Sequence, residues 1–297
     1  MANSLVRINV GDIREGLHTS PKGRSGVICV TRPITKARLE NAIMQLDHEE
    51  EDAIWVRFDH ESFRLGSYQV IPALRSLTSI QRMDIWGDRD YLIVSEYPAF
   101  RKVARLSGWR GPIDWDSLRS EARERMTHLA IARRFNPYSP NFHLIAYYSD
   151  EPFVPFDFLK RVQVDSKEEA QIFCLYFNSI FFLVQWFMRR EETSVRFPDL
   201  REDDLELMHI LSPEAIDQER REELVALFDS IKNLRFPSLM EQLQNPPSVR
   251  LDLDRTILRT LGLLPSRVDE MLPRIYTALA TEFKVARGLR KETFKQY

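Results

Sequence analysis

A run of seventeen largely apolar residues, Ile172 to Met188, constrains the fold of this chain more than any other segment. Acidic residues stand directly before it and arginines directly after it, and the polar pair Asn178-Ser179 interrupts its middle. A helix that crosses a bilayer needs about 20 mostly apolar residues. The run therefore predicts a helix buried in a protein core and no membrane span.

The composition is that of an ordinary globular protein. The chain has 297 residues, of which 43% are hydrophobic and 29% charged, which is enough for one large domain or two ordinary ones. Both cysteines, Cys29 and Cys174, lie in apolar runs and are expected to be buried free thiols of a reducing compartment. No secretory signal opens the sequence, so we expect a cytoplasmic location.

The charge is nearly balanced overall but uneven along the chain. A formal net charge of −2 counts against unspecific coating of nucleic acid, which needs a strong positive excess. Between Arg101 and Arg134, however, nine basic residues face four acidic ones. This local excess fits a basic groove and equally fits the solvated face of a helix.

The order of expected elements predicts an α+β, mixed α/β fold. It has a small mixed sheet, long amphipathic helices and a mostly helical C-terminal third. Strands are expected at 27–30, 54–58, 91–94 and 142–148. Helices are expected at 36–46, 117–134, 166–190, 212–233, 250–261 and 266–287. Prolines predict loops at 135–141 and 149–155. The chain divides into a mixed α/β segment (1–100), a central domain (101–245) and a helical C-terminal segment (246–297).

Two groups of side chains have the chemistry to bind DNA. Arginine can grip guanine and asparagine can grip adenine through two hydrogen bonds each, and other polar side chains hold phosphates. The first group lies in one loop: Arg133, Arg134, Asn136, Ser139 and Asn141. The second follows the apolar helix: Arg189, Arg190, Thr193 and Arg196. Each has a plainer explanation, because loop asparagines also bond their own backbone and arginines complement a helix C-terminus.

The arrangement of these segments resembles a known family. Residues 133–142, the strand-like run 143–148 and the proline-bounded segment 149–155 lead to Phe177-Asn178-Ser179, and then to Arg189–Thr193 and Phe197–Leu200. Over residues 130–245 this order is similar to the target recognition domain of adenine-N6 DNA methyltransferases of restriction–modification systems. The resemblance implies that double-stranded DNA is the ligand. For Asn178 and Ser179 we expect a structural hydrogen-bond anchor beneath the recognition surface.

The catalytic motifs of that family are incomplete here. No Gly-x-Gly loop is present, and neither Asn136-Pro137-Tyr138 nor Asn245-Pro246-Pro247-Ser248 completes the Asn-Pro-Pro-Tyr tetrapeptide that stacks on a flipped adenine. The sequence also shows no phosphate loop, no nucleophile elbow and no histidine or cysteine pair at zinc spacing. We therefore expect no enzyme, cofactor site or metal site on this chain. The resemblance places S-adenosylmethionine on an associated catalytic domain or subunit.

Two function classes follow from these observations, and a third stays open. The first is a DNA-binding module that positions a methyltransferase or restriction–modification enzyme on duplex DNA. The second is a protein-interaction module without a nucleic-acid role, which the balanced charge and apolar helices favour. An enzyme with an unfamiliar site would reveal itself through perturbed titratable groups in a cleft.

Overall fold

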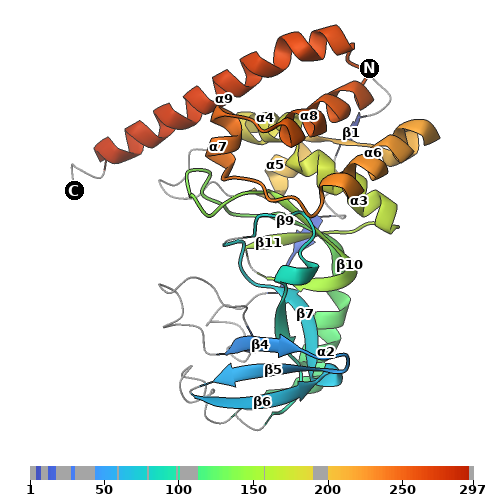
Figure 1. Ribbon diagram of the computed structural model, residues 1–297, viewed down its shortest axis with the longest axis vertical. Helices are drawn as coiled ribbons and strands as arrows, with labels where there is room; N and C mark the ends of the chain where they lie inside the picture. Colours follow the sequence, from blue (N-terminus) through green and yellow to red (C-terminus); the bar gives the residue numbers. More distant parts are fainter. Residues whose placement is uncertain are drawn as a thin grey trace.

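The structure, a computed structural model, describes residues 5–7, 13–17, 28–30, 44–58, 60–78, 80–97, 100, 113–156, 158–189 and 200–293. Most helices occupy one end of the molecule, a large sheet lies in the middle, and a small sheet with one helix beside it forms the other end (Figure 1). The fold is α+β, and its C-terminal part is helical, as the sequence predicts.

The large sheet has seven strands in the order β2-β11-β9-β10-β7-β8-β3. Their bounds are β2 (Ile13–Glu15), β3 (Ile28–Val30), β7 (Val70–Leu74), β8 (Asp90–Ile93), β9 (Thr127–Ala132), β10 (Ala146–Pro155) and β11 (Leu159–Val162). All neighbours are antiparallel except β10 and β7, which run parallel. The strands predicted at 27–30 and 91–94 are confirmed. Because β7 pairs with β10, the sheet unites strands from both sides of residue 100.

The remaining strands form two small sheets. One consists of β4 (Gln45–Glu49), β5 (Ala53–Phe58) and β6 (Glu61–Gly66), and the other pairs β1 (Leu5–Arg7) with β12 (His209–Leu211). The strand predicted at 54–58 is confirmed. Of the helix predicted at 36–46, residues 36–43 lie outside the described residues, and the end is wrong because residues 45–46 belong to β4.

The helices and short 3-10 turns account for most of the rest. The α-helices are α2 (Trp115–Glu124), α3 (Lys167–Asn178), α4 (Ile180–Arg189), α5 (Glu202–Glu206), α6 (Gln218–Ile231), α7 (Leu239–Gln244), α8 (Ser248–Thr260) and α9 (Pro265–Thr293). The 3-10 turns are η3 (Ser67–Gln69), η4 (Trp86–Asp88) and η5 (Pro213–Ala215). The last two predicted helices are confirmed, and they meet at Gly262, whose φ of 86° suits glycine. Helix α9 continues past the predicted end at residue 287 to Thr293.

The helix predicted at 117–134 ends early. Asp114 caps α2 by accepting a hydrogen bond from the backbone N–H of Ser117, and the helix stops at Glu124. Residues 127–132 form β9 instead, between β11 and β10 in the sheet. A short apolar run buried on both faces has no alternation that distinguishes a strand from a buried helix.

Two further boundaries differ from the prediction. The loop expected at 149–155 belongs to β10, where a register shift between Tyr148 and Phe153 accommodates the prolines. The helix expected from Ser212 begins at Gln218 after the η5 turn, with Asp217 as its N-cap. Serine and aspartate are both favoured N-cap residues, so Ser212 and Asp217 are both candidates for the start of the helix. In the structure Ser212 precedes the η5 turn, and Asp217 caps the α-helix.

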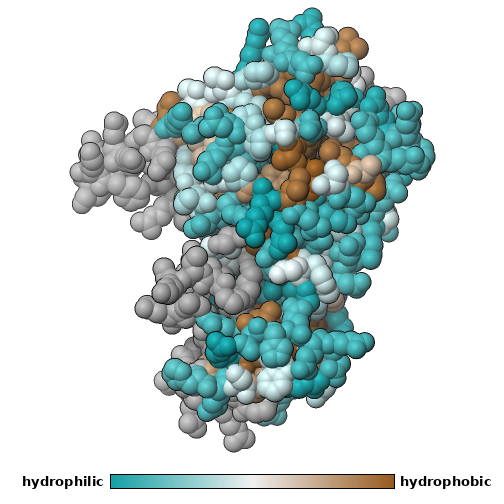
Figure 2. All heavy atoms as spheres, viewed as in Figure 1, coloured by the Kyte–Doolittle hydropathy of each residue, from teal (hydrophilic) through white to brown (hydrophobic). Residues whose placement is uncertain are grey.

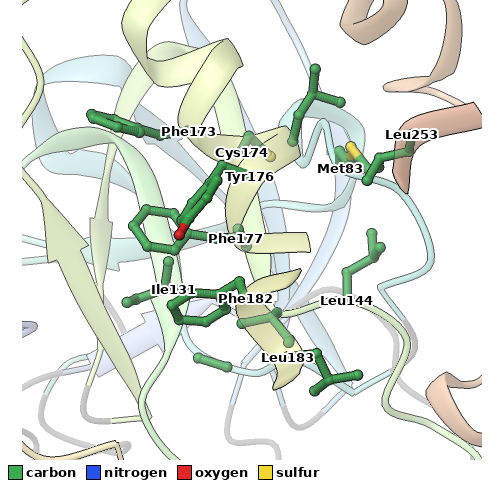
Figure 3. Packing of buried hydrophobic residues seen from close by; sticks show 14 of the residues in the cluster. Met83, Ile131, Leu144, Phe173, Cys174, Tyr176, Phe177, Phe182, Leu183 and Leu253 are labelled. Carbon is green, nitrogen blue, oxygen red and sulfur yellow. The ribbon is translucent and has the colours of Figure 1, made fainter. Parts of the chain in front are cut away.

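The apolar run 172–188 forms α3 and α4, which pack between the sheet and the other helices. Figure 3 shows Phe177 and Phe182 of these helices beside Ile131 of β9, and the two rings meet edge to face at 4.9 Å. Residues 172–180 are all buried, including the free thiol of Cys174; the Cys29 side chain lies outside the described residues. Among the described residues no single helix has the length and apolar composition of a membrane span.

Candidate nucleic-acid interface

The candidate loop connects β9 to β10 at one end of the large sheet. Its first residue, Arg133, is fixed on both sides: its backbone N–H donates to the carbonyl of Phe158 at 2.9 Å, and its carbonyl accepts from the N–H of Leu200 at 2.8 Å. At the far end of the loop, the carbonyl of Phe142 accepts from the N–H of Leu239 at 2.9 Å. The loop is therefore tied to the turn after β10 and to the start of α7.

Aromatic side chains anchor the loop in the helical layer. The rings of Phe135 and Phe142 stack at 4.5 Å between centroids, and Phe135 also lies 4.5 Å from Trp186 of α4. Tyr138 meets Phe283 of α9 edge to face. Phe135 and Phe142 are each at most 5% exposed, so the two ends of the loop have little freedom to move.

Two of the five predicted loop residues bond to the loop itself. The side-chain oxygen of Asn136 accepts from the backbone N–H of Tyr138 at 3.1 Å, and the hydroxyl of Ser139 accepts from the N–H of Asn141 at 3.2 Å. Both side chains are half-buried. These are the local side-chain turns that the plainer explanation predicts. They shape the loop and leave other residues to face a ligand.

The other three predicted residues differ in exposure. Arg134 and Asn141 are exposed, while Arg133 is half-buried. Arg134 and Asn141 lie on opposite arms of a loop whose intervening turn is closed by the bond from the Ser139 N–H to the Asn136 carbonyl, at 3.0 Å. The structure thus presents one arginine and one asparagine to solvent from a single fixed loop.

The second predicted group cannot be placed. Arg189 ends α4, but its side chain lies outside the described residues, and so do Arg190, Thr193 and Arg196. Their phosphate contacts stay a prediction.

Asn178 supports the loop from beneath, as the sequence predicts. Its side-chain oxygen accepts from the backbone N–H of Ile145 at 2.8 Å and of Ala146 at 3.0 Å, and its amide donates to the carbonyls of Ala146 and Cys174. The side chain is 1% exposed. The structural anchor expected for this residue is confirmed, and it fixes the point where the loop enters β10.

Ser179 breaks the apolar run into two helices, which the sequence analysis missed. Its backbone is extended (φ −74°, ψ 158°), and α3 and α4 meet at 60°. Its hydroxyl accepts from the N–H of Phe182, while the carboxylate of Asp254 in α8 accepts from the N–H of Ile180 at 2.6 Å. The break is stabilised because the freed N–H groups at the start of α4 find buried acceptors.

A buried ion pair extends this support to the other helices. Arg250 donates to Asp254 at 3.0 Å and to Gln242 at 3.2 Å, and Gln242 donates to the carbonyl of His143 at 2.7 Å. The hydroxyl of Tyr276 donates to Asp254. Burial by itself would lower the pKa of Arg250. The charges of Asp254 and Tyr276 and their hydrogen bonds with the guanidinium have the larger effect, so the pKa of Arg250 is raised. The chain of contacts ends at the loop, so α7, α8 and α9 all help to hold it.

A second basic region, missed by the sequence analysis, lies on the sheet beyond the loop. Arg14 of β2 and Arg161 of β11 are directly paired across the strands, and Arg125 follows α2 nearby. Burial, together with the charges of Arg14 and Arg125, lowers the pKa of Arg161. Arg161 and Arg125 donate to the carbonyls of Glu124 and Gly16. Strand register brings these arginines together, and register is not readable from their spacing in the sequence.

In the three-stranded sheet β4-β5-β6, acidic side chains form ion pairs with arginines. Arg57 pairs with Asp47, and Arg64 pairs with Glu50 and Asp52. In the acidic run 49–52, Glu50 and Asp52 therefore share Arg64 of the same sheet, and Glu49 pairs with Arg89 before β8. No group of three or more histidine, cysteine or acidic side chains with metal-binding geometry occurs among the described residues.

Comparison with known proteins identifies a shared fold. No protein-family model and no curated protein matches the sequence. The solved structure of the type IIG restriction endonuclease BpuSI is similar, with a TM-score of 0.55 and 13% sequence identity. The similarity covers 94% of this chain and 32% of the BpuSI chain. The chain therefore has a fold found within a type IIG restriction endonuclease, and it spans about a third of that enzyme's chain.

Proposed function

We propose that this chain is a target recognition module that binds a specific sequence in duplex DNA and positions a restriction–modification enzyme there. The observation that carries the proposal is the loop at 133–143, because it is fixed by backbone bonds and buried aromatic rings yet exposes Arg134 and Asn141. Rigid presentation of an arginine and an asparagine is what direct base recognition requires. The fold shared with a restriction endonuclease supports this use of the loop.

Phosphate contacts would fix the module on the duplex. The arginines at 14, 125 and 161 gather on the sheet beyond the loop, and Arg133 lies between that region and the exposed arm of the loop. Such contacts orient a protein without reading the sequence. A net charge of −2 is compatible with this role because phosphate contacts need only a local group of basic side chains, although Arg125 also pairs with Glu121 at 3.1 Å.

The proposal assigns catalysis elsewhere. The cognate enzyme is an adenine-N6 methyltransferase with its own S-adenosylmethionine site, on a joined domain or a separate subunit. The incomplete catalytic motifs of the sequence support this division of labour. In this scheme the chain supplies specificity, and its partner supplies the chemistry.

The test is DNA binding by matched variants. A duplex would be selected from a randomised pool by the full chain, and its affinity measured by fluorescence anisotropy at about 50 mM salt, where phosphate contacts are strong. Arg134→Ala and Asn141→Ala should each weaken binding by about 1–3 kcal/mol and relax the preference at one base pair. Arg235→Ala and Asn245→Ala are controls, because both residues are exposed on the helical part of the molecule. Equal affinities for all four variants would remove the loop from the interface.

A protein-interaction role is the second candidate, and a surface feature favours it. Apolar side chains reach the surface over the helical part of the molecule (Figure 2). Among the large exposed ones are Met188 near the end of α4, Leu264 before α9 and Val285 within α9. Exposed apolar side chains are candidates for contact with another protein when they gather in a patch. Size-exclusion chromatography that shows association through these helices, with no DNA binding at 50 mM salt, would favour this role.

A further inference from the structure

An exposed aromatic ring stands next to the candidate loop. Phe158 is 54% exposed, although its neighbours Phe156 and Leu159 are each only 1% exposed. It lies in the tight turn between β10 and β11, which is closed by a hydrogen bond from the Leu159 N–H to the Phe156 carbonyl at 2.7 Å. The turn therefore buries Phe156 and Leu159 and leaves the Phe158 ring in solvent.

The turn is braced from two directions. On one side the carbonyl of Phe158 itself accepts from the N–H of Arg133. On the other, the N–H of Leu17 donates to the carbonyl of Pro155 at 2.7 Å, and Gly16 approaches so closely that an added Cβ would lie 2.5 Å from that carbonyl oxygen. A ring on a braced turn loses little conformational freedom when it binds, which favours its use in recognition.

Positive charges flank the ring. Arg133 is bonded to the same residue through the backbone, and exposed Arg134 is next in sequence. Arg161 lies three residues further along β11, roughly 10 Å away at the rise of a strand. An apolar ring beside cationic side chains suits the surface of DNA, where base pairs lie between two lines of phosphate; the acidic neighbour Asp157 lies outside the described residues.

We propose that Phe158 contacts the base pairs of bound duplex DNA as an apolar wedge, stacking its ring at a base step beside the pairs read by the loop. The inference rests on the proposed function. Arginines on either side would hold the phosphates, while the ring displaces base–base stacking and locally opens the step, as apolar wedges do in other DNA-binding proteins. The aromatic face makes the contact tolerant of sequence, so specificity stays with Arg134 and Asn141.

The test compares substitutions at two exposed aromatic positions. Phe158→Ala should weaken binding of the selected duplex by roughly five- to 150-fold, whereas Phe158→Trp should keep most of the affinity. Tyr68→Ala is the matched control, because Tyr68 is 74% exposed but belongs to η3, away from the loop. The slope of log Kd against log salt should be unchanged in Phe158→Ala, since no phosphate contact is lost. In Arg133→Ala the magnitude of this salt slope should fall by about one, because one phosphate contact is lost.

A second readout reports on the bases. In selected duplexes that carry 2-aminopurine at successive positions, binding of the parent protein should raise the fluorescence at one step, and Phe158→Ala should abolish the rise. Unchanged affinity and unchanged fluorescence in Phe158→Ala, with specific binding by the parent protein intact, would overturn the wedge and leave the proposed function standing. Absence of DNA binding by the parent protein would overturn both.

Discussion

The most demanding structural prediction concerns Asn178→Ala. The side-chain oxygen of Asn178 accepts hydrogen bonds from the backbone N–H groups of Ile145 and Ala146. Its side-chain NH₂ group donates to the carbonyls of Ala146 and Cys174. The substitution leaves these buried groups without that partner, and a buried polar group left unpaired costs about 1–3 kcal/mol. Counting only the two N–H groups, we expect the free energy of unfolding to fall by about 2–6 kcal/mol.

Urea unfolding followed by circular dichroism measures this loss, and amide hydrogen exchange locates it. Exchange should accelerate first in peptides that contain Ile145 and Ala146, because these amides lose their acceptor. Asn233→Ala is the control: Asn233 is exposed after α6, and surface substitutions usually change stability by less than about 0.5 kcal/mol. If Asn178→Ala is no less stable than Asn233→Ala, the side chain does not anchor the loop and the account of the interface fails.

Two further predictions concern packing and pH. Gly16→Ala should lower the free energy of unfolding by about 1–3 kcal/mol, because the new methyl group would lie 2.5 Å from the backbone carbonyl oxygen of Pro155. Gly87→Ala is the control, because its new methyl group would meet only a side-chain nitrogen of Arg82 at 3.4 Å. In the same urea assay the stability of Gly87→Ala should be close to that of the parent protein. Burial raises the pKa of the Cys174 thiol and of the Tyr276 hydroxyl. In the unfolded chain the thiol and the hydroxyl have pKa values of about 8.5 and about 10, so above these pH values unfolding releases a proton from each group. The free energy of unfolding should therefore be highest below about pH 8 and should decline towards about pH 10.5. The decline is up to about 1.4 kcal/mol per pH unit for each group. Urea midpoints measured across this range would contradict the assignment if they stayed constant.

The elements that sequence reasoning located best carry strong local signals. The capping serine of α3 is an example, since Ser166 accepts from the Glu169 N–H, and so is the glycine break between α8 and α9. Asn178 was also identifiable, because a polar side chain within an apolar helix must find a buried partner. The cap and the glycine break depend on residues within one or two turns of one another, and for Asn178 the local pattern predicts the need for a partner but not that the partners are Ile145 and Ala146.

The features that were missed depend on contacts distant in sequence. Residues 127–132 become a strand because β10 and β11 take up their backbone groups on either side, and the break at Ser179 is completed by Asp254, seventy-four residues away. Arg14 and Arg161 meet only through strand register. Phe158 carries no sequence signal at all, since its exposure depends on how its turn is braced by Gly16 and Arg133.

The affinity ratio between a selected duplex and a scrambled duplex of the same composition tests the central claim most directly. Both would be measured with the full chain, in the same buffer and across a range of salt concentrations. A sequence-reading module should prefer its selected site by about 10³-fold or more at physiological salt. Equal affinities, or selection rounds that enrich no common sequence, would contradict the claim that this fold reads DNA.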